Sequence, residues 1–157
     1  MTQNLTNNGL KIALFEPDIP QNTAAIIRTC ACLGAKLEII EPCGFLLNDK
    51  RFKRVDMDYM DEKEIKFYKN FDYFFESKEN QRIILMTTKA SVSYTTFKFN
   101  KNDTILFGRE SAGVPDRVHK LIKNRLMIPM KKNKRSLNVA SSVSIILAES
   151  LKQSNLI

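Results

Sequence analysis

The sequence has one histidine and three cysteines among its 157 residues, and this scarcity excludes two kinds of site. Cys30, Cys32 and Cys43 form no CxxC pair, so with a single histidine they make no zinc framework, and we expect no metal site. Reduced cysteines in or near a core are expected instead. A Ser-His-Asp hydrolase would have to use His119, but no GxSxG segment exists, and we expect a surface or structural role for His119.

Long apolar runs are also missing. The stretches 83–86 and 145–148 are far shorter than the roughly 20 residues that a membrane-spanning helix needs. The first ten residues are polar and contain no hydrophobic signal core, so we expect a cytoplasmic protein. The composition, 43% hydrophobic and 27% charged, is typical of a globular chain. We therefore predict a flexible extension over 1–10 and one domain over 11–157.

The common nucleotide-binding fingerprints are absent as well. Neither GxGxxG nor GxxxxGK[ST] occurs, which excludes the usual dinucleotide and P-loop motifs. The nearest glycine-rich segment runs from Gly108 to Gly113, directly after an apolar stretch, with Glu110 between the two glycines. Such a segment suits a close approach of the backbone to a ligand, and it equally suits a tight turn.

The net charge of +8 is concentrated in one segment. Eight basic residues and no acidic residue lie between Arg117 and Arg135, whereas the rest of the chain carries 17 charges of each sign. Clustered positive charge is the electrostatic footprint of a polyanion partner, although a solvated charged face has the same composition.

Apolar runs alternate with stretches of helical composition, which predicts an α/β fold with a mostly parallel sheet flanked by helices. The expected strands are 11–15, 36–40, 82–86, 94–99, 103–107 and 125–130. The expected helices are 24–33, capped by Asn22 and Thr23 and ended by Gly34, then one or two helices within 61–77, then 115–122 and 139–151. Because ligands bind outside the carboxyl ends of parallel strands, the loops 16–21, 87–91, 108–114 and 130–137 are the candidate site.

Four segments together resemble the signature motifs of the SpoU branch of the SPOUT superfamily of RNA methyltransferases. They are IPQNTAAIIR (19–28), LFGRESAGVP (106–115), MIPM (127–130) and RSLNVA (135–140). The similarity continues through 41–45, 49–54, 58–59 and 85–89, and so extends from about residue 11 to 151. Within this branch the set is similar to small single-domain enzymes that methylate the ribose 2′-hydroxyl of the tRNA wobble nucleotide, a cytidine or modified uridine.

The resemblance implies a deep trefoil knot in the C-terminal half, a homodimer, and S-adenosylmethionine as the methyl donor. It places the cofactor contacts on Met86, Thr87, Gly108, Glu110, Gly113, Ile128, Met130, Ser136 and Asn138. It also implies catalytic roles for Arg28, Asn22, Glu110 and Asn138. From the residues alone, Arg28 could equally form a surface ion pair on a helix, and the segment 136–138 could simply cap the last helix.

The sulfonium of this cofactor is a strong electrophile, so the enzyme mainly has to align a ribose hydroxyl with the methyl group. A guanidinium hardly deprotonates, and we therefore interpret Arg28 as a bidentate clamp on the adjacent phosphate that also stabilises the developing alkoxide. Arg28 acting as the base is the alternative.

Two basic clusters are the candidate contacts to the phosphates of an anticodon stem-loop. They consist of Arg51, Lys53 and Arg54 in the first cluster and of Lys131, Lys132, Lys134 and Arg135 in the second. The chain departs from the family pattern at Met60, Arg109, Ala112 and Ala148, positions that could touch RNA or the dimer partner. These departures keep two alternatives open: 2′-O-methylation of another tRNA position or of rRNA, and a non-catalytic RNA-binding protein of the same fold.

Overall fold

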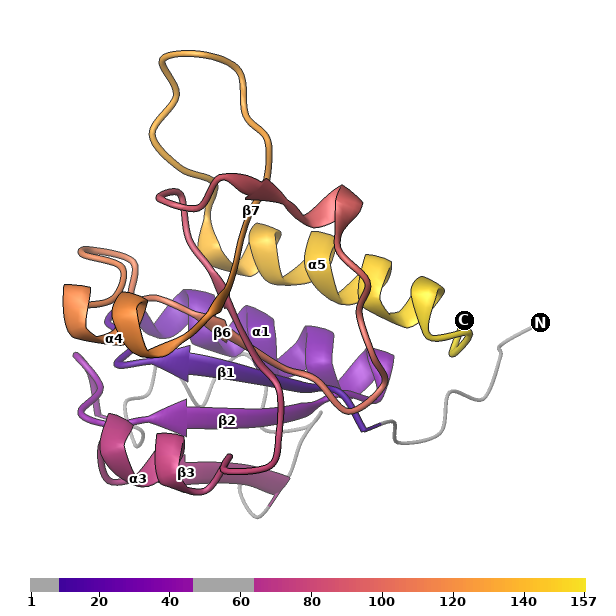
Figure 1. Ribbon diagram of the computed structural model, residues 1–157. Coiled ribbons are helices and arrows are strands. Elements are labelled where there is room, and N and C mark those ends of the chain that lie inside the picture. Colours follow the sequence, from indigo (N-terminus) through magenta and orange to yellow (C-terminus); the bar gives the residue numbers. More distant parts are fainter. Residues whose placement is uncertain (1–8, 47–63) are drawn as a thin grey trace.

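The computed structural model describes residues 9–46 and 64–157, and within them it shows a seven-stranded sheet (Figure 1). The strand order is β3-β2-β1-β6-β4-β7-β5, and every ladder between neighbouring strands is parallel. The bounds are β1 Lys11–Phe15, β2 Lys36–Ile40, β3 Ile65–Tyr68, β4 Ile83–Met86, β5 Val92–Ser93, β6 Thr104–Phe107 and β7 Asn124–Met127. The predicted α/β fold with a parallel sheet is confirmed, whereas the knot stays a prediction.

Helices cover both faces of this sheet. Among the described residues they are α1 Pro20–Leu33, α3 Phe71–Glu76, α4 Asp116–Leu121 and α5 Val139–Gln153, with a 3₁₀ turn at Tyr94–Thr96. Helices α1 and α5 lie side by side on one face (Figure 1). Gly34 ends α1 as predicted, because its φ of 72° is a left-handed conformation that glycine adopts without strain.

Alternate residues of the strands enter two separate cores. In β1, Ile12 and Leu14 pack in the core beneath α1 and α5, whereas Ala13 and Phe15 pack in the core beneath α3 and α4. Both sets are buried, which is expected for central parallel strands that are covered on both faces. The first core also contains Leu10, which is fully buried, so the folded domain includes the last residue of the predicted N-terminal extension.

Three local predictions were wrong. Residues 65–68, predicted as helix, form β3, because pairing with β2 overrides the helical propensity of this charged segment. Helix α1 begins at Pro20 instead of after Asn22 and Thr23, since proline at the first turn presets the helical φ and loses no hydrogen bond there. The edge strand predicted over 94–99 is instead Val92–Ser93, followed by the 3₁₀ turn.

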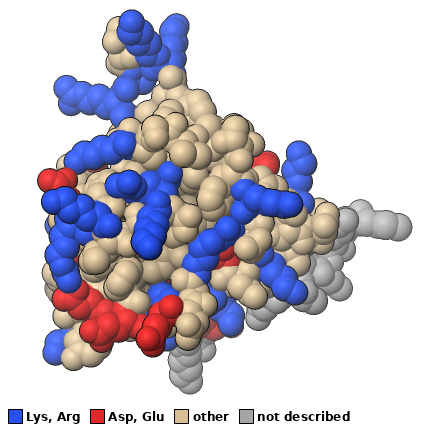
Figure 2. All heavy atoms as spheres, in the orientation of Figure 1, with Lys and Arg blue, Asp and Glu red and all other residues tan. Residues whose placement is uncertain are grey.

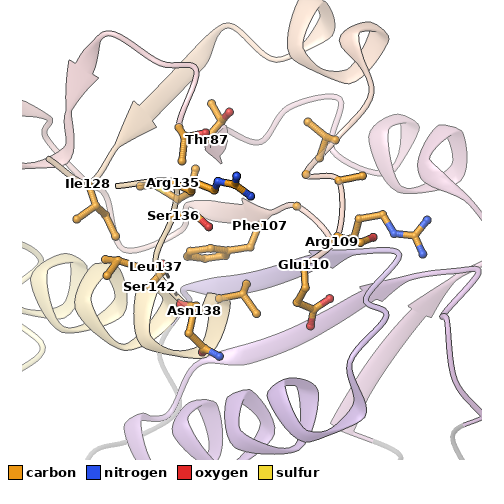
Figure 3. Close-up of a pocket in the computed structure, with 18 of the residues that line it drawn as sticks. Thr87, Phe107, Arg109, Glu110, Ile128, Arg135, Ser136, Leu137, Asn138 and Ser142 are labelled. Carbon is orange, nitrogen blue, oxygen red and sulfur yellow. Dashed lines mark hydrogen bonds between the residues drawn. The ribbon is translucent and has the colours of Figure 1, made fainter. Parts of the chain in front are cut away.

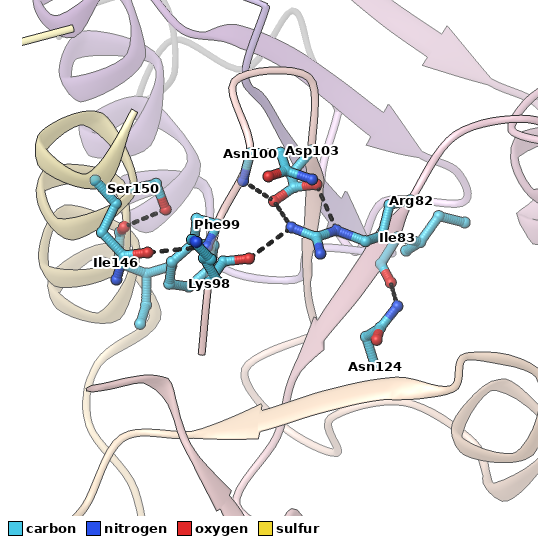
Figure 4. A network of polar contacts seen from close by, with 10 residues as sticks. Arg82, Ile83, Lys98, Phe99, Asn100, Asp103, Asn124, Ile146 and Ser150 are labelled. Carbon is cyan, nitrogen blue, oxygen red and sulfur yellow. Dashed lines mark hydrogen bonds and ion pairs between the residues drawn. The ribbon is translucent and has the colours of Figure 1, made fainter. Parts of the chain in front are cut away.

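A partly buried ion pair links segments at the amino edge of the sheet (Figure 4). Arg82 precedes β4 and donates from Nε and Nη2 to the two carboxylate oxygens of Asp103, at 2.8 and 2.7 Å. Nη2 also donates to the carbonyl of Lys98, and Asp103 accepts the N–H of Asn100. The pair therefore fixes the connection between β5 and β6 against β4.

We expect Arg82→Ala to lower the free energy of unfolding by about 2 kcal/mol, because Asp103 is almost fully buried and would lose its charged partner. Urea denaturation followed by circular dichroism measures this. Arg117→Ala is the matched control, since it breaks an exposed pair with Asp72 and should cost less than about 1 kcal/mol. Equal losses in the two variants would contradict this account.

Candidate functional site

A cavity of about 520 Å³ opens at the carboxyl edge of the sheet (Figure 3). The loops after β4, β6 and β7 meet there with the first turns of α1 and α5, as expected for the ligand site of a parallel sheet. The lining residues are Ile19, Asn22, Met86, Thr87, Thr88, Lys89, Phe107, Gly108, Arg109, Glu110, Ser111, Ala112, Gly113, Val114, His119, Ile128, Met130, Arg135, Ser136, Leu137, Asn138, Val139 and Ser142.

All nine residues expected to contact the cofactor line this one cavity. The ends of three neighbouring strands bring them together: Met86 ends β4, Gly108 follows β6, and Ile128 follows β7. Apolar side chains, such as Phe107 and Ile128, and polar groups at the start of α5 face the same space (Figure 3). A mixed lining of this kind suits a small organic ligand with one apolar and one polar part.

The two glycines of the segment 108–113 close a tight loop. Arg109 and Gly113 exchange both backbone hydrogen bonds, at 3.1 and 2.8 Å. A side chain at Gly108 would place its Cβ only 2.6 Å from the carbonyl carbon of Gly113. Gly113 has a φ of 65°, in the left-handed region. The close approach is thus between the two glycines, and the resulting tight turn is also part of the cavity wall.

Two carboxylates hold the loop after β1 against the loop after β6. Glu110 Oε2 accepts the backbone N–H of Asp18 at 2.9 Å, and Asp18 Oδ1 accepts the backbone N–H of Glu110 at 3.2 Å. The Ser111 hydroxyl donates to Asp18 Oδ2. Each carboxylate therefore satisfies the other residue's backbone, and we call these paired residues the Asp18–Glu110 clamp.

The pKa values of the clamp move in opposite directions. Burial, and then the neighbouring Asp18 carboxyl, raise the pKa of Glu110 above its ordinary value. Hydrogen bonding with Glu110, followed by the Ser111 hydroxyl and the Arg109 charge, lowers the pKa of Asp18 to about 2. A divergence of this kind is typical of functional sites, where one of two close carboxyls takes the proton first.

Asn22 and Asn138 connect this clamp to the last helix. Asn22 Nδ2 donates to Glu110 Oε1 at 3.4 Å, and Asn22 Oδ1 accepts from Asn138 Nδ2 at 2.9 Å. Asn138 Oδ1 in turn accepts the N–H groups of Ala140 and Ser141, so Asn138 caps α5. Asn138 thus caps the helix and also lines the cavity.

Arg109, where the sequence was expected to depart from the family pattern, has ion-pair partners within the chain. Arg109 Nη1 lies 3.5 Å from Glu16 Oε2, and Nε lies 3.4 Å from Asp18 Oδ2, an ion pair without hydrogen-bond geometry. Arg109 also lines the cavity. Its guanidinium therefore reinforces the same junction between the loops after β1 and β6.

Of the remaining predicted residues, only Arg135 lines the cavity among those that the structure describes. Arg28 is exposed on α1 and is not among the residues that line the cavity. Lys131, Lys132 and Lys134 are exposed in the segment between β7 and α5, which projects from the fold in Figure 1 and carries gathered basic side chains in Figure 2. Arg135, also exposed, lines the cavity. Arg51, Lys53, Arg54 and Met60 fall outside the described residues.

Asp18 and His119 are two of the contributors to the site that sequence reasoning missed. Asp18 belongs to a loop that was predicted to face the site, but its pairing with Glu110 was not foreseen, because 92 positions separate the two residues. His119 was expected to be a surface or structural residue, yet it lines the cavity. The sequence did offer one signal for a place near the site, because His119 follows a glycine-rich loop at the end of a predicted strand. No cluster of metal-ligating side chains and no membrane-spanning helix occurs in the described parts of the chain.

The fold and the cavity define an α/β protein with a cavity of ligand size at the carboxyl edge of a parallel sheet. The model of the SpoU rRNA methylase family matches residues 9–148, and the chain belongs to this family. A tRNA (cytidine(34)-2′-O)-methyltransferase of Beijerinckia indica is 44% identical over 144 residues, which are 90% of each chain.

The chain is also similar to solved structures of RNA methyltransferases. One, described as giving structural insights into the 2-OH methylation of C/U34 on tRNA, is 34% identical, with a TM-score of 0.88 over 94% of this chain and 97% of the other. An AdoMet-bound rRNA methyltransferase from Sinorhizobium meliloti is 23% identical, with a TM-score of 0.83 over 96% of this chain and 58% of the other. The second likeness is one of fold alone.

Proposed function

We propose that this protein transfers a methyl group from S-adenosylmethionine to the ribose 2′-hydroxyl of the wobble nucleotide in a tRNA anticodon loop. The observation that carries the proposal is the convergence of all nine expected cofactor residues on one cavity. The proposed substrate is supported by relatives that align with most of the chain and are named tRNA (cytidine(34)-2′-O)-methyltransferases. A cytoplasmic location, where tRNA functions, belongs to the same proposal.

The cavity fits such a cofactor. Its volume lies within the range of about 300–1,000 Å³ that is usual for small-molecule sites. Met86, Phe107 and Ile128 offer apolar surface for a nucleoside base, and Ser136 and Asn138 offer polar groups. Bound there, S-adenosylmethionine would supply an electrophilic methyl group. The half-buried Glu110 side chain lines the cavity, and as a carboxylate it would favour a ligand that carries positive charge.

The protein's own residues would position the cofactor and place a positive charge near the substrate. The Asp18–Glu110 clamp and the bond between Asn22 and Asn138 hold the cavity wall in place before substrate arrives. Arg28 is the group assigned to the substrate phosphate and to the developing alkoxide. Because Arg28 lies outside the cavity of its own chain, this role requires that the substrate, or a second chain, bring the two together.

A homodimer is part of the proposal. The exposed faces of α1 and α5 carry small or apolar side chains where a solvated surface would carry charge, and Arg28 lies on the same side of α1. These exposed residues are Ala25, Cys32, Ser141, Ser144, Ile145 and Ala148. A dimer through this face would bury them and would place Arg28 at the boundary between the chains.

We expect Ala148→Arg to convert the dimer into a monomer, because a long cation would stand in the middle of this face, at one of the positions where the chain departs from the family pattern. Size-exclusion chromatography with light scattering measures the mass. Glu79→Arg, which also introduces an exposed arginine but on the side of the sheet that bears α3, is the control and should leave the mass unchanged. A dimeric A148R protein would exclude this interface.

The segment between β7 and α5 is assigned to RNA phosphates. We expect the double substitution Lys132→Ala and Lys134→Ala to weaken tRNA binding and to reduce the slope of log K against log salt by about 2, one for each lost phosphate contact. Filter binding between low and high salt measures the slope. Neither lysine lines the cavity, so cofactor affinity serves as the internal control. An unaltered slope would remove both lysines from the RNA surface.

The proposed activity has a direct test. The protein is incubated with labelled S-adenosylmethionine and bulk tRNA from a strain that lacks the gene, and the product is digested and analysed by mass spectrometry. A 2′-O-methyl nucleotide at the wobble position supports the proposal. Methylation of another tRNA position, or of rRNA in a parallel reaction, would keep the chemistry and change the substrate. Cofactor binding without any transfer would favour a non-catalytic RNA-binding protein.

A further inference from the structure

The only histidine of the chain lies against a residue that ends a central strand. His119 is on α4, and its Nε2 is 2.9 Å from the hydroxyl oxygen of Thr87, the first residue after β4. Both residues line the cavity. The contact therefore joins two segments of the cavity wall that are 32 positions apart in the sequence.

The neighbouring groups determine which atom donates in this contact. His119 Nδ1 lies 3.3 Å from the carbonyl oxygen of Pro115, which can only accept, so Nδ1 carries the hydrogen. In the neutral ring Nε2 is then an acceptor, and the Thr87 hydroxyl donates to it. The same hydroxyl oxygen accepts the backbone N–H of Lys89 at 3.2 Å. This chain of hydrogen bonds fixes the orientation of the Thr87 side chain.

His119 is held more firmly than the loop that it contacts. Val118 and Ile122, which flank it, are each only 2% exposed and pack into the core beneath α4. A second link between these segments is the ion pair of Lys89 with Asp116, at 3.7 Å, but both of its side chains are largely exposed and it contributes little. The imidazole is thus the main polar contact from α4 to the loop 87–90.

We propose that His119 is a positioning residue for the cofactor: through the Thr87 hydroxyl it holds the loop after β4 in the shape that binds S-adenosylmethionine. The inference rests on the proposed function, since it needs that cofactor in the cavity. The proposal gives a function to His119, for which the sequence predicted only a surface or structural role. His119 itself performs no chemical step.

The test is a double-mutant cycle on the affinity for S-adenosylhomocysteine, the product form of the cofactor, measured by isothermal titration calorimetry. His119→Leu should weaken binding about tenfold in the otherwise unchanged protein, which corresponds to one lost hydrogen bond. In a Thr87→Val background the same substitution should have no further effect, because its partner hydroxyl is already gone. His119→Gln, whose side-chain oxygen can accept from Thr87, should restore most of the affinity.

Steady-state kinetics give a second readout. In H119L the KM for S-adenosylmethionine should rise while kcat changes little, a split that a general loss of folding would not produce. Asp116→Asn, which removes the exposed ion pair without touching His119, is the matched control and should leave both constants unchanged. Equal effects of H119L in the two backgrounds, or none in either, would overturn the role of His119 alone. Failure of the unchanged protein to bind the cofactor would overturn the proposed function as well.

Discussion

Arg28→Ala should reduce the rate of methyl transfer by about 10²- to 10³-fold, the usual cost of removing one group that stabilises a developing oxyanion. The affinity for S-adenosylmethionine should not change, because Arg28 is exposed on α1 and does not line the cavity. Single-turnover transfer with saturating tRNA measures the rate, and calorimetry measures the affinity. The two results together separate a role toward RNA from a role toward the cofactor.

Lys101→Ala is the control for the loss of a positive charge, since Lys101 is exposed in the turn between Asn100 and Asp103, at the opposite edge of the sheet. It should leave the rate unchanged. Arg28→Lys adds a second comparison. A lysine keeps the charge but not the bidentate geometry, so the R28K protein should keep partial activity if Arg28 binds the substrate phosphate. If R28A methylates tRNA at the normal rate, Arg28 has no part in the reaction.

Gly108→Ala should abolish cofactor binding and lower the free energy of unfolding by about 3 kcal/mol. The added Cβ would stand 2.6 and 2.7 Å from two backbone atoms of Gly113, and backbone that is closed by two hydrogen bonds cannot yield locally. The whole segment 108–113, which forms one wall of the cavity, would have to move. Calorimetry with S-adenosylhomocysteine and urea denaturation measure the two effects.

Gly113→Ala distinguishes crowding from backbone strain. Beyond the two adjacent residues, no atom lies within 4 Å of a Cβ at Gly113, so only the cost of its positive φ applies, about 1 kcal/mol. The expected order of stability is therefore the unchanged protein, then G113A, then G108A. A Gly108→Ala protein as stable as G113A would mean that the loop can open without loss.

The sequence predicts the central part of the fold well because its signals are local. The apolar runs at β1 and β2 have the predicted ends, and Gly34 ends α1 as expected. β3 was missed because its residues 65–68 take strand form only by pairing with β2, a contact between distant segments. The start of α1 was misplaced because Asn22 has the side chain of a helix cap but instead bonds Glu110 and Asn138.

In the candidate site too, local patterns could be predicted and contacts between distant segments could not. Its residues could be named from the four motifs and the segment 85–89, each contiguous in the sequence, and the structure brings nine of these residues to one cavity. The contacts between distant segments could not be foreseen, since the Asp18–Glu110 clamp and the bond from His119 to Thr87 join residues 92 and 32 positions apart. Local patterns indicate which residues take part, and only the fold shows which of them touch.

Strand β6 is fastened at both of its ends by carboxylates: Asp103 precedes it and binds Arg82, and Glu110 follows it in the clamp with Asp18. It also lies between β1 and β4, so both of its edges are hydrogen bonded. Amides in such a strand exchange with solvent only when the whole domain opens. Phe107, at the end of β6, lines the cavity, so we expect the cavity to rest on a slowly exchanging strand, whereas amides of the exposed segment between β7 and α5, the proposed RNA contact, should exchange fast.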